Sequence, residues 1–309
     1  INYFDTNSEL YGCINDGINI TSFIKSKFKY LSQNIIFLND RKNNTNQPTK
    51  NNIIKSLNDI INKINNINEE SELWLSFSGH GTQVSDHNYD EISDNYDEVI
   101  VPSDYMTSGF ITDDTLYSTL KKINNSKCKV MALFDCCNSG TILDLNKKYV
   151  NNNYSKIENK NPCLKCKIFM ISGCKDNQTS ADYFDHQSNK YGGALTNSFL
   201  KFTKPSNGIT FIDLINKMRG HLRKSRFTQI PQITTNSLLN NRTYIFKKNG
   251  SEINLLFQQN PPKISLLEQR RRRRRRRRRM MILRRRRRRR RRRMMMLRRR
   301  RRRRRRRRN

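Results

Sequence analysis

The chain has 309 residues and a formal net charge of +36, which taken alone indicates a nucleic-acid partner. Three pure arginine runs near the C-terminus hold 31 of the 62 basic residues, so residues 1–269 carry a net charge of only +5. That body has the composition of an ordinary soluble protein, and a collagen, a coiled coil and a disulfide-stapled miniprotein are excluded.

Several features of the body predict a cytoplasmic protein. No stretch approaches the roughly 18 apolar residues that cross a bilayer, and the first residues form no signal peptide. Seven cysteines, an odd number at irregular positions, indicate reduced thiols. The chain opens without Met on an apolar stub, which indicates that the first half of a strand is missing.

Helix and strand patterns alternate along the body. The predicted elements of the first part are a helix over 12–30, a short strand over 34–38, a helix after Pro48-Thr49 and a buried strand over 72–77. A second part follows, with strands at 99–101, 129–134 and 167–173, and helices at 113–123, 193–202 and 210–222. This alternation predicts an α/β fold with a mostly parallel sheet covered by helices on both faces.

The chain divides into four predicted segments. They are a large catalytic half (1–145), a linker rich in Asn and Lys (146–166), a smaller half (167–250) and a low-complexity basic tail (251–309).

A histidine and a cysteine are predicted at the same edge of the sheet. His80 and Cys137 each follow a predicted strand and lie close to a glycine, and ligands bind at the carboxyl ends of parallel strands. A histidine can convert a cysteine to its nucleophilic thiolate near neutral pH. The alternative is that His80 is a turn residue and that Cys136 and Cys137 are buried thiols.

Two motifs around these residues resemble the metacaspases, a family of caspase-like cysteine peptidases, and their type I members in particular. The motifs are Trp74-Leu-Ser-Phe-Ser-Gly-His80-Gly-Thr-Gln and Asp135-Cys-Cys137-Asn-Ser-Gly-Thr. Further ordered matches extend the resemblance over roughly residues 1–245; they include Gly12-Cys13-Ile-Asn-Asp16, Tyr96-Asp97-Glu98, Asp113-Asp114 and the segment from Ile171 to Asp182. Asn138 departs from the family's more usual His.

The resemblance implies a caspase-like fold and a cysteine endopeptidase. The Cys137 thiolate would attack the scissile carbonyl and His80 would protonate the leaving amine. The backbone N–H groups of Gly81 and Cys137 would hold the oxyanion.

The resemblance also implies cleavage after Arg or Lys. The family's pocket positions correspond to Cys13, Asp16, Ser78 and Asp135, and two carboxylates in a partly dry cleft favour a guanidinium. The alternative for Asp135 is that it caps the helix that follows it.

Calcium is the cofactor that the resemblance implies. The family's calcium-binding aspartates correspond to Asp97, Asp113, Asp114 and Asp144, and oxygen ligands suit a hard cation. Taken without the family, the same residues are ordinary solvated acids or the start of a helix. The lone pair Cys163 and Cys166 is a weak signal for a metal or redox site.

The family also suggests how the chain is processed. Family members are usually monomers, and a chain that cuts after basic residues could cut its own linker, where the candidate sites are Lys147, Lys148, Lys156, Lys160, Lys165 and Lys167.

The arginine tail supports a second reading of the chain, as an electrostatic arm for nucleic acid or anionic membrane. A reading-frame slip or a repeat expansion is favoured over that role, because the body is rich in Asn, Lys and Ile, as an AT-rich genome would give. In addition, an enzyme that cuts after Arg would digest the tail. A third reading is a catalytically inactive scaffold, against which both His80 and Cys137 are retained.

Overall fold

The computed structural model describes residues 1–85, 96–150, 153–156, 164–173, 182–185, 189–204, 207–249 and 252–254. All of them belong to one compact unit, Ile1–Gln258. The remaining unit, Gln259–Asn309, holds the arginine runs and lies outside the described residues, so the proposed roles of the tail stay predictions. In the described ranges, no helix is long and apolar enough to cross a membrane.

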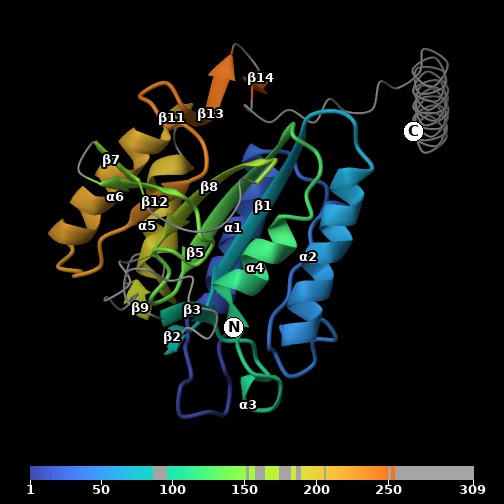
Figure 1. The fold of residues 1–309 in the computed structure, drawn as a ribbon. Coiled ribbons are helices and arrows are strands. Elements are labelled where there is room, and N and C mark those ends of the chain that lie inside the picture. The colour runs from blue at the N-terminus through green and yellow to red at the C-terminus, as the bar shows by residue number, and fades with distance from the viewer. Residues whose placement is uncertain are drawn as a thin grey trace, which may run out of the picture. The chain divides into compact units, whose positions relative to one another are not determined.

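A six-stranded sheet forms the centre of the unit (Figure 1). Its strands lie in the order β1 (Ser71–Ser78), β5 (Cys128–Asp135), β8 (Lys167–Ser172), β12 (Gln232–Thr235), β6 (Lys147–Val150) and β7 (Asn153–Lys156). Strands β1, β5 and β8 are parallel, as predicted, whereas the pairings from β8 onwards are antiparallel. The sheet is therefore mixed, with a parallel half that contains both predicted motifs.

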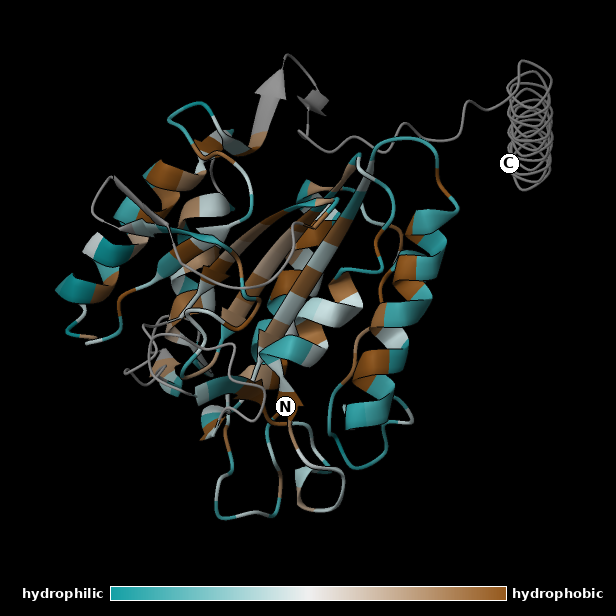
Figure 2. Cartoon of the chain, viewed as in Figure 1, coloured by the Kyte–Doolittle hydropathy of each residue, from teal (hydrophilic) through white to brown (hydrophobic). Residues whose placement is uncertain are grey.

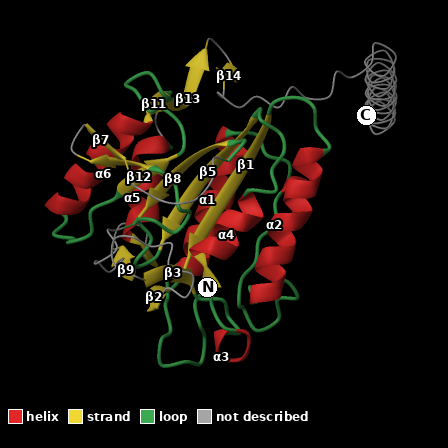
Figure 3. Cartoon of the chain, viewed as in Figure 1, coloured by secondary structure: helices red, strands yellow, loops and turns green. Residues whose placement is uncertain are grey.

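Helices cover both faces of this sheet (Figure 3). One face carries α1 (Cys13–Lys27), α5 (Ala194–Thr203) and α6 (Phe211–Lys224), and the other carries α2 (Lys50–Asn65) and α4 (Asp113–Leu120). The short helices η1 (Ser32–Asn34) and α3 (Tyr105–Ser108) lie in connections. This confirms the predicted layers.

The sequence of β5 explains why both faces must be covered. Its side chains alternate between the two cores: Met131 and Leu133 belong to the α1/α5/α6 core, and Val130, Ala132 and Phe134 to the α2/α4 core. All five are at most 2% exposed. Burial of a large apolar side chain contributes about 1.5–3 kcal/mol, so both helical layers are needed to keep this strand dry. Figure 2 shows brown, hydrophobic residues on the central strands and on the helices beside them.

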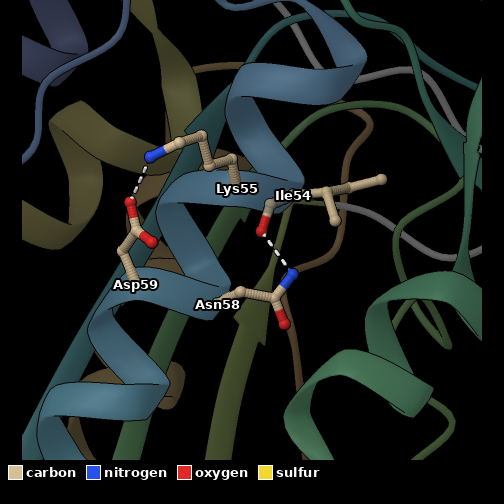
Figure 4. Close-up of polar contacts among 4 residues, drawn as sticks. All are labelled: Ile54, Lys55, Asn58 and Asp59. Carbon is tan, nitrogen blue, oxygen red and sulfur yellow. Dashed lines mark hydrogen bonds and ion pairs between the residues drawn. The ribbon is translucent and has the colours of Figure 1, made fainter.

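Helix α2 follows directly from its sequence. The Thr49 hydroxyl accepts a hydrogen bond from the Asn52 backbone N–H at 3.2 Å and so caps the helix. Its inner face buries Ile61 at 1% exposure, while its outer face carries the exposed Lys55–Asp59 ion pair at 2.7 Å (Figure 4). Such a pair adds little stability, so the apolar face holds the helix in place.

Three small sheets surround the central one. They are β2 (Gly81–Ser85), β3 (Tyr96–Ile100) and β4 (Ile111–Thr112); the hairpin β9 (Asp182–Asp185) and β10 (Lys190–Gly193); and β11 (Gly208–Thr210), β13 (Tyr244–Asn249) and β14 (Glu252–Asn254). The first two flank the carboxyl ends of β1 and β5.

Three segments differ from the prediction. Residues 34–38 form no strand: Asn34 ends η1, and residues 35–38 continue as irregular chain. Ile36 is 42% exposed, and none of the described strands pairs with this segment. The predicted linker contains β6 and β7, since Tyr149 is only 3% exposed in the core and anchors β6 beside β12. Residues 252–254 likewise pair with β13, although they were assigned to the tail.

Candidate active site

The register of the central sheet places His80 and Cys137 side by side. Ser78 and Asp135 are partners at the ends of the parallel strands β1 and β5, and His80 and Cys137 each follow two residues later. Neighbouring strands lie about 4.8 Å apart. Gly81 makes the approach close, because a Cβ atom there would collide with the Cys137 carbonyl oxygen. The predicted meeting of the two motifs at one sheet edge is therefore present.

The two adjacent cysteines lie in different environments. Cys136 is 1% exposed and belongs to the α2/α4 core, whereas Cys137 is only partly buried. Asn138 adopts a left-handed backbone conformation (φ 48°) that Asn tolerates better than most residues. Of the two thiols, Cys137 is the one that a substrate could reach.

The His80 imidazole is oriented by the N-terminal segment. Its Nε2 lies 2.7 Å from the Ser8 carbonyl oxygen. A carbonyl oxygen only accepts, so Nε2 carries the hydrogen, and in the neutral ring Nδ1 is then the atom with a free lone pair. The neutral histidine can therefore act as a base through Nδ1.

Asp16 and Asp135 meet around one glycine. Both carboxylate oxygens of Asp16 accept from the Gly193 backbone N–H at 3.0 Å. Oδ2 of Asp135 accepts from the backbone N–H and the hydroxyl of Thr196, both at 2.8 Å. A Cβ atom at Gly193 would collide with the Asp135 carboxylate and lie 2.8 Å from Oδ2 of Asp16. Asp135 thus bonds to the first turn of α5.

The environment of this pair raises the pKa of Asp16 well above its ordinary value. Burial is the largest cause and the Asp135 carboxylate the second, while the Gly193 N–H acts in the opposite direction. Cys13 lies beside the same carboxylates, and burial raises its thiol pKa as well. Ser78 is in place at the end of β1. The four predicted pocket residues therefore gather at this sheet edge.

Asp182 is a third carboxylate that the prediction did not assign to the pocket. Its Oδ2 accepts from the backbone N–H groups of Tyr11 at 2.6 Å and Gly12 at 3.2 Å. Its Oδ1 is buried without a hydrogen-bond partner among the described residues. Asp182 also raises the pKa of Asp16. Its position at the end of the segment from Ile171 was the available signal.

The aspartates predicted to bind calcium lie near the sheet β2–β3–β4. Asp113 is 1% exposed, and its carboxylate accepts from the backbone N–H groups of Glu98 and Asp114, both at 2.8 Å. Burial first, then Asp144 and Glu98, raise the Asp113 pKa to about 10. Glu98 is not among the predicted calcium ligands. Asp97, its neighbour on β3, is a predicted ligand but points to the opposite face of that strand.

These acids do not form a ready metal site. Within the described ranges, no group of three or more His, Cys, Asp or Glu side chains is arranged to hold a metal ion. Calcium binding thus stays a prediction. Cys166 is buried with a free thiol, and Cys163 lies outside the described residues.

A mixed sheet between two helical layers, with a histidine and a cysteine after adjacent parallel strands, defines a caspase-like fold. Residues 1–146 match the family model for the metacaspase peptidase C14 domain. The chain is 30% identical over 286 residues to metacaspase-1 of Meyerozyma guilliermondii, covering 76% of this chain and 67% of the relative. It is 30% identical over 255 residues to metacaspase-3 of Trypanosoma brucei brucei, covering 77% and 70%. The chain therefore belongs to the metacaspase family.

Two further comparisons set the scope of this assignment. Metacaspase-1 of Plasmodium falciparum is 34% identical over 257 residues, covering 80% of this chain and 41% of the relative, so the chain spans less than half of that relative's length. The crystal structure of protein GSU0716 from Geobacter sulfurreducens has a TM-score of 0.54 at 22% identity, covering 77% of this chain and 89% of that one. That likeness concerns the fold alone.

Proposed function

We propose that the chain is a cysteine endopeptidase that cuts peptide bonds after Arg or Lys. The observation that carries the peptidase activity is the placement of Cys137, the accessible thiol of its pair, one strand away from the oriented His80. The family assignment supports the same chemistry.

The proposed reaction uses both side chains in turn. His80 takes the thiol proton, the Cys137 sulfur bonds to the scissile carbonyl carbon, and the oxyanion accepts from the backbone N–H groups of Gly81 and Cys137. Collapse of this intermediate breaks the C–N bond, and His80 gives its proton to the leaving amine. Water, deprotonated by His80, then hydrolyses the thioester and releases the acid and the free thiol.

The acidic cluster at Gly193 supports the choice of Arg or Lys. Asp16, Asp135 and Asp182 approach one another in a largely buried place. A guanidinium would keep these carboxylates ionised and form paired charge-assisted hydrogen bonds, whereas an acidic side chain would be repelled. Protein substrates exposing basic residues are thus the proposed partners, and we propose a monomer as the active form.

Calcium is proposed as an activating ion. Mutual repulsion among Asp113, Asp144 and Glu98 contributes to the raised Asp113 pKa, and a divalent cation would offset that repulsion. Because these side chains are not yet arranged as ligands, binding has to draw them together. Calcium should therefore raise the Tm of the protein, and Asp113→Asn should weaken that effect.

The test of the activity compares peptides that differ only at the cleaved residue. Fluorogenic peptides ending in Arg, Lys or Asp are hydrolysed by the wild type and by Cys137→Ala, with calcium or with chelator. Hydrolysis of the Arg and Lys peptides alone, lost in Cys137→Ala, is expected. Equal hydrolysis of the Asp peptide would overturn the specificity, and no hydrolysis by a folded protein would overturn the activity.

A further inference from the structure

Residues 1–10, in the segment before α1, contact His80 through Tyr3 and Ser8. Beyond the contact of Ser8 with Nε2, the Tyr3 hydroxyl accepts from the His80 backbone N–H at 2.8 Å and donates to the Val101 carbonyl at 2.8 Å. The Tyr3 ring lies against the imidazole, with centroids 4.6 Å apart. Val101 N–H in turn donates to the His80 carbonyl at 3.1 Å. One tyrosine thus links His80 to the strand end beside it.

The position of Tyr3 depends on a second residue far away in the sequence. The two carboxylate oxygens of Asp40 accept from the backbone N–H groups of Asn2 at 2.8 Å and Tyr3 at 2.6 Å. The Asn2 side chain accepts from the Ile14 N–H, and its carbonyl accepts from the Leu10 N–H. These bonds close residues 2–10 into a loop that is fixed at both ends.

The backbone of this loop is strained at the residue that touches His80. Tyr3 has φ 53° and is 4% exposed. A bulky residue rarely adopts this left-handed conformation, and it persists only where the surroundings enforce it. Asp40 supplies that enforcement, because it bonds the Tyr3 N–H directly. The strain is consistent with a residue selected for the placement of its side chain.

We propose that Tyr3 and Asp40 are positioning residues of the peptidase, which hold His80 in the place that proton transfer with Cys137 requires. Tyr3 fixes the backbone and one ring face of His80, and Asp40 fixes Tyr3. Neither touches the reacting atoms in this arrangement. The proposal rests on the proposed role of His80 as the base and is independent of the Arg or Lys preference.

The first test is Tyr3→Phe, which removes the hydroxyl and keeps the ring. The His80 N–H and the Val101 carbonyl then lose their shared partner, so we expect kcat on the preferred peptide to fall about tenfold, the equivalent of one hydrogen bond, with KM within twofold. Tyr3→Leu also removes the ring and should lower kcat further. The matched control is Tyr149→Phe in β6, which lies beside the edge strand β7 and three strands away from β5; it removes the hydroxyl of a buried tyrosine and should leave kcat unchanged.

The second test is Asp40→Asn. An amide has one accepting oxygen, so only one of the two N–H groups keeps its partner, and kcat should fall with KM little changed. Asp59→Asn, which removes one exposed charge from α2 (Figure 4), is the charge-matched control. Because Asp40 acts through Tyr3, the double variant should lose less than the product of the two single losses.

An assay that needs no peptide substrate tests this proposal independently of the proposed preference for Arg or Lys. The rate of Cys137 alkylation by iodoacetamide, followed by mass spectrometry, depends on the thiolate that His80 helps to form. Tyr3→Phe and Asp40→Asn should slow it severalfold at 25 °C, while both controls match the wild type. If the two variants lower Tm but alkylate and turn over like the controls, their role is structural only and the proposal is wrong.

Discussion

Gly193→Ala tests the acidic cluster through a single methyl group. The backbone at Gly193 (φ −71°, ψ 137°) is open to any residue, so the change causes no backbone strain. The added Cβ would collide with the Asp135 carboxylate and lie 2.8 Å from Oδ2 of Asp16. Contacts between heavy atoms normally lie near 3.5–4.0 Å, so both carboxylates must move apart by about 1 Å.

The expected effects follow from this displacement. Overpacking of a filled site costs about 1–3 kcal/mol, which should lower Tm by about 2–4 °C per kcal/mol. A misplacement of about 1 Å reduces turnover by about a hundredfold, so kcat/KM for an Arg peptide should fall by about that factor. Gly220→Ala in α6 is the matched control, because nothing lies within 4 Å of its added methyl group and the helix should gain about 0.5–1 kcal/mol.

Differential scanning calorimetry measures the change in Tm, and peptide hydrolysis on the same preparations measures the change in kcat/KM. If Gly193→Ala hydrolyses Arg peptides as fast as Gly220→Ala, the carboxylates beside Gly193 do not bind the substrate's basic side chain. A large loss of stability with unchanged turnover would have the same meaning.

Three further results are expected. Burial raises the pKa of Asp16 well above its usual range, and a bound guanidinium would lower it again, so an Arg peptide that binds Cys137→Ala should release protons. Calorimetry in buffers of different ionisation enthalpy measures this release; Asp16→Asn should release fewer protons, and equal release would refute the linkage. Burial raises the pKa of Glu72 to about 8. Between pH 4.5, near the pKa of Glu72 in the unfolded chain, and about pH 8, only the folded state keeps this proton, so the stability of the protein falls as pH rises. At pH 9, Glu72→Gln should therefore be more stable than the wild type by up to about 5 kcal/mol. Equal urea midpoints of the two proteins at pH 9 would contradict this. Lys148 lies in β6, opposite Thr234 of β12, so self-cleavage there requires β6 to detach from the sheet. Peptide mapping should therefore find that the exposed Lys165 is cut faster than Lys148, and the reverse order would count against the strand pairing.

Much of the fold could be predicted because local pattern and tertiary burial agree. The apolar side chains of β5 point to both faces of the sheet, so both faces must be covered. In α2, Thr49 marks the start of the helix and Ile61 marks its inner face. The prediction of a strand at residues 34–38 is wrong for the opposite reason, since none of the strands that the structure describes pairs with this apolar run. Strand β2 is short and polar, and its pairing with β3 is set by tertiary context.

The structure brings the two predicted motifs to one edge of the sheet, whereas the contacts that reach this edge from distant segments were not predicted. His80 and Cys137 could be placed together because each follows a recognisable parallel strand. Gly193, Asp182 and Tyr3 reach the same edge from distant segments through backbone contacts. No spacing in the sequence encodes the contacts of Gly193 and Tyr3, so single-sequence reasoning could not assign those two residues to the site, whereas Asp182 had a signal in its position at the end of the segment from Ile171.

Covalent trapping tests the central claim, that Cys137 is a nucleophile served by a pocket for basic residues. The full chain is treated with an arginyl chloromethyl ketone and the labelled peptide is identified by mass spectrometry. One label on Cys137, slowed by His80→Ala and by excess Arg peptide, is expected, with an aspartyl analogue reacting far more slowly. A label on Cys136, or equal labelling by the aspartyl analogue, would contradict the account.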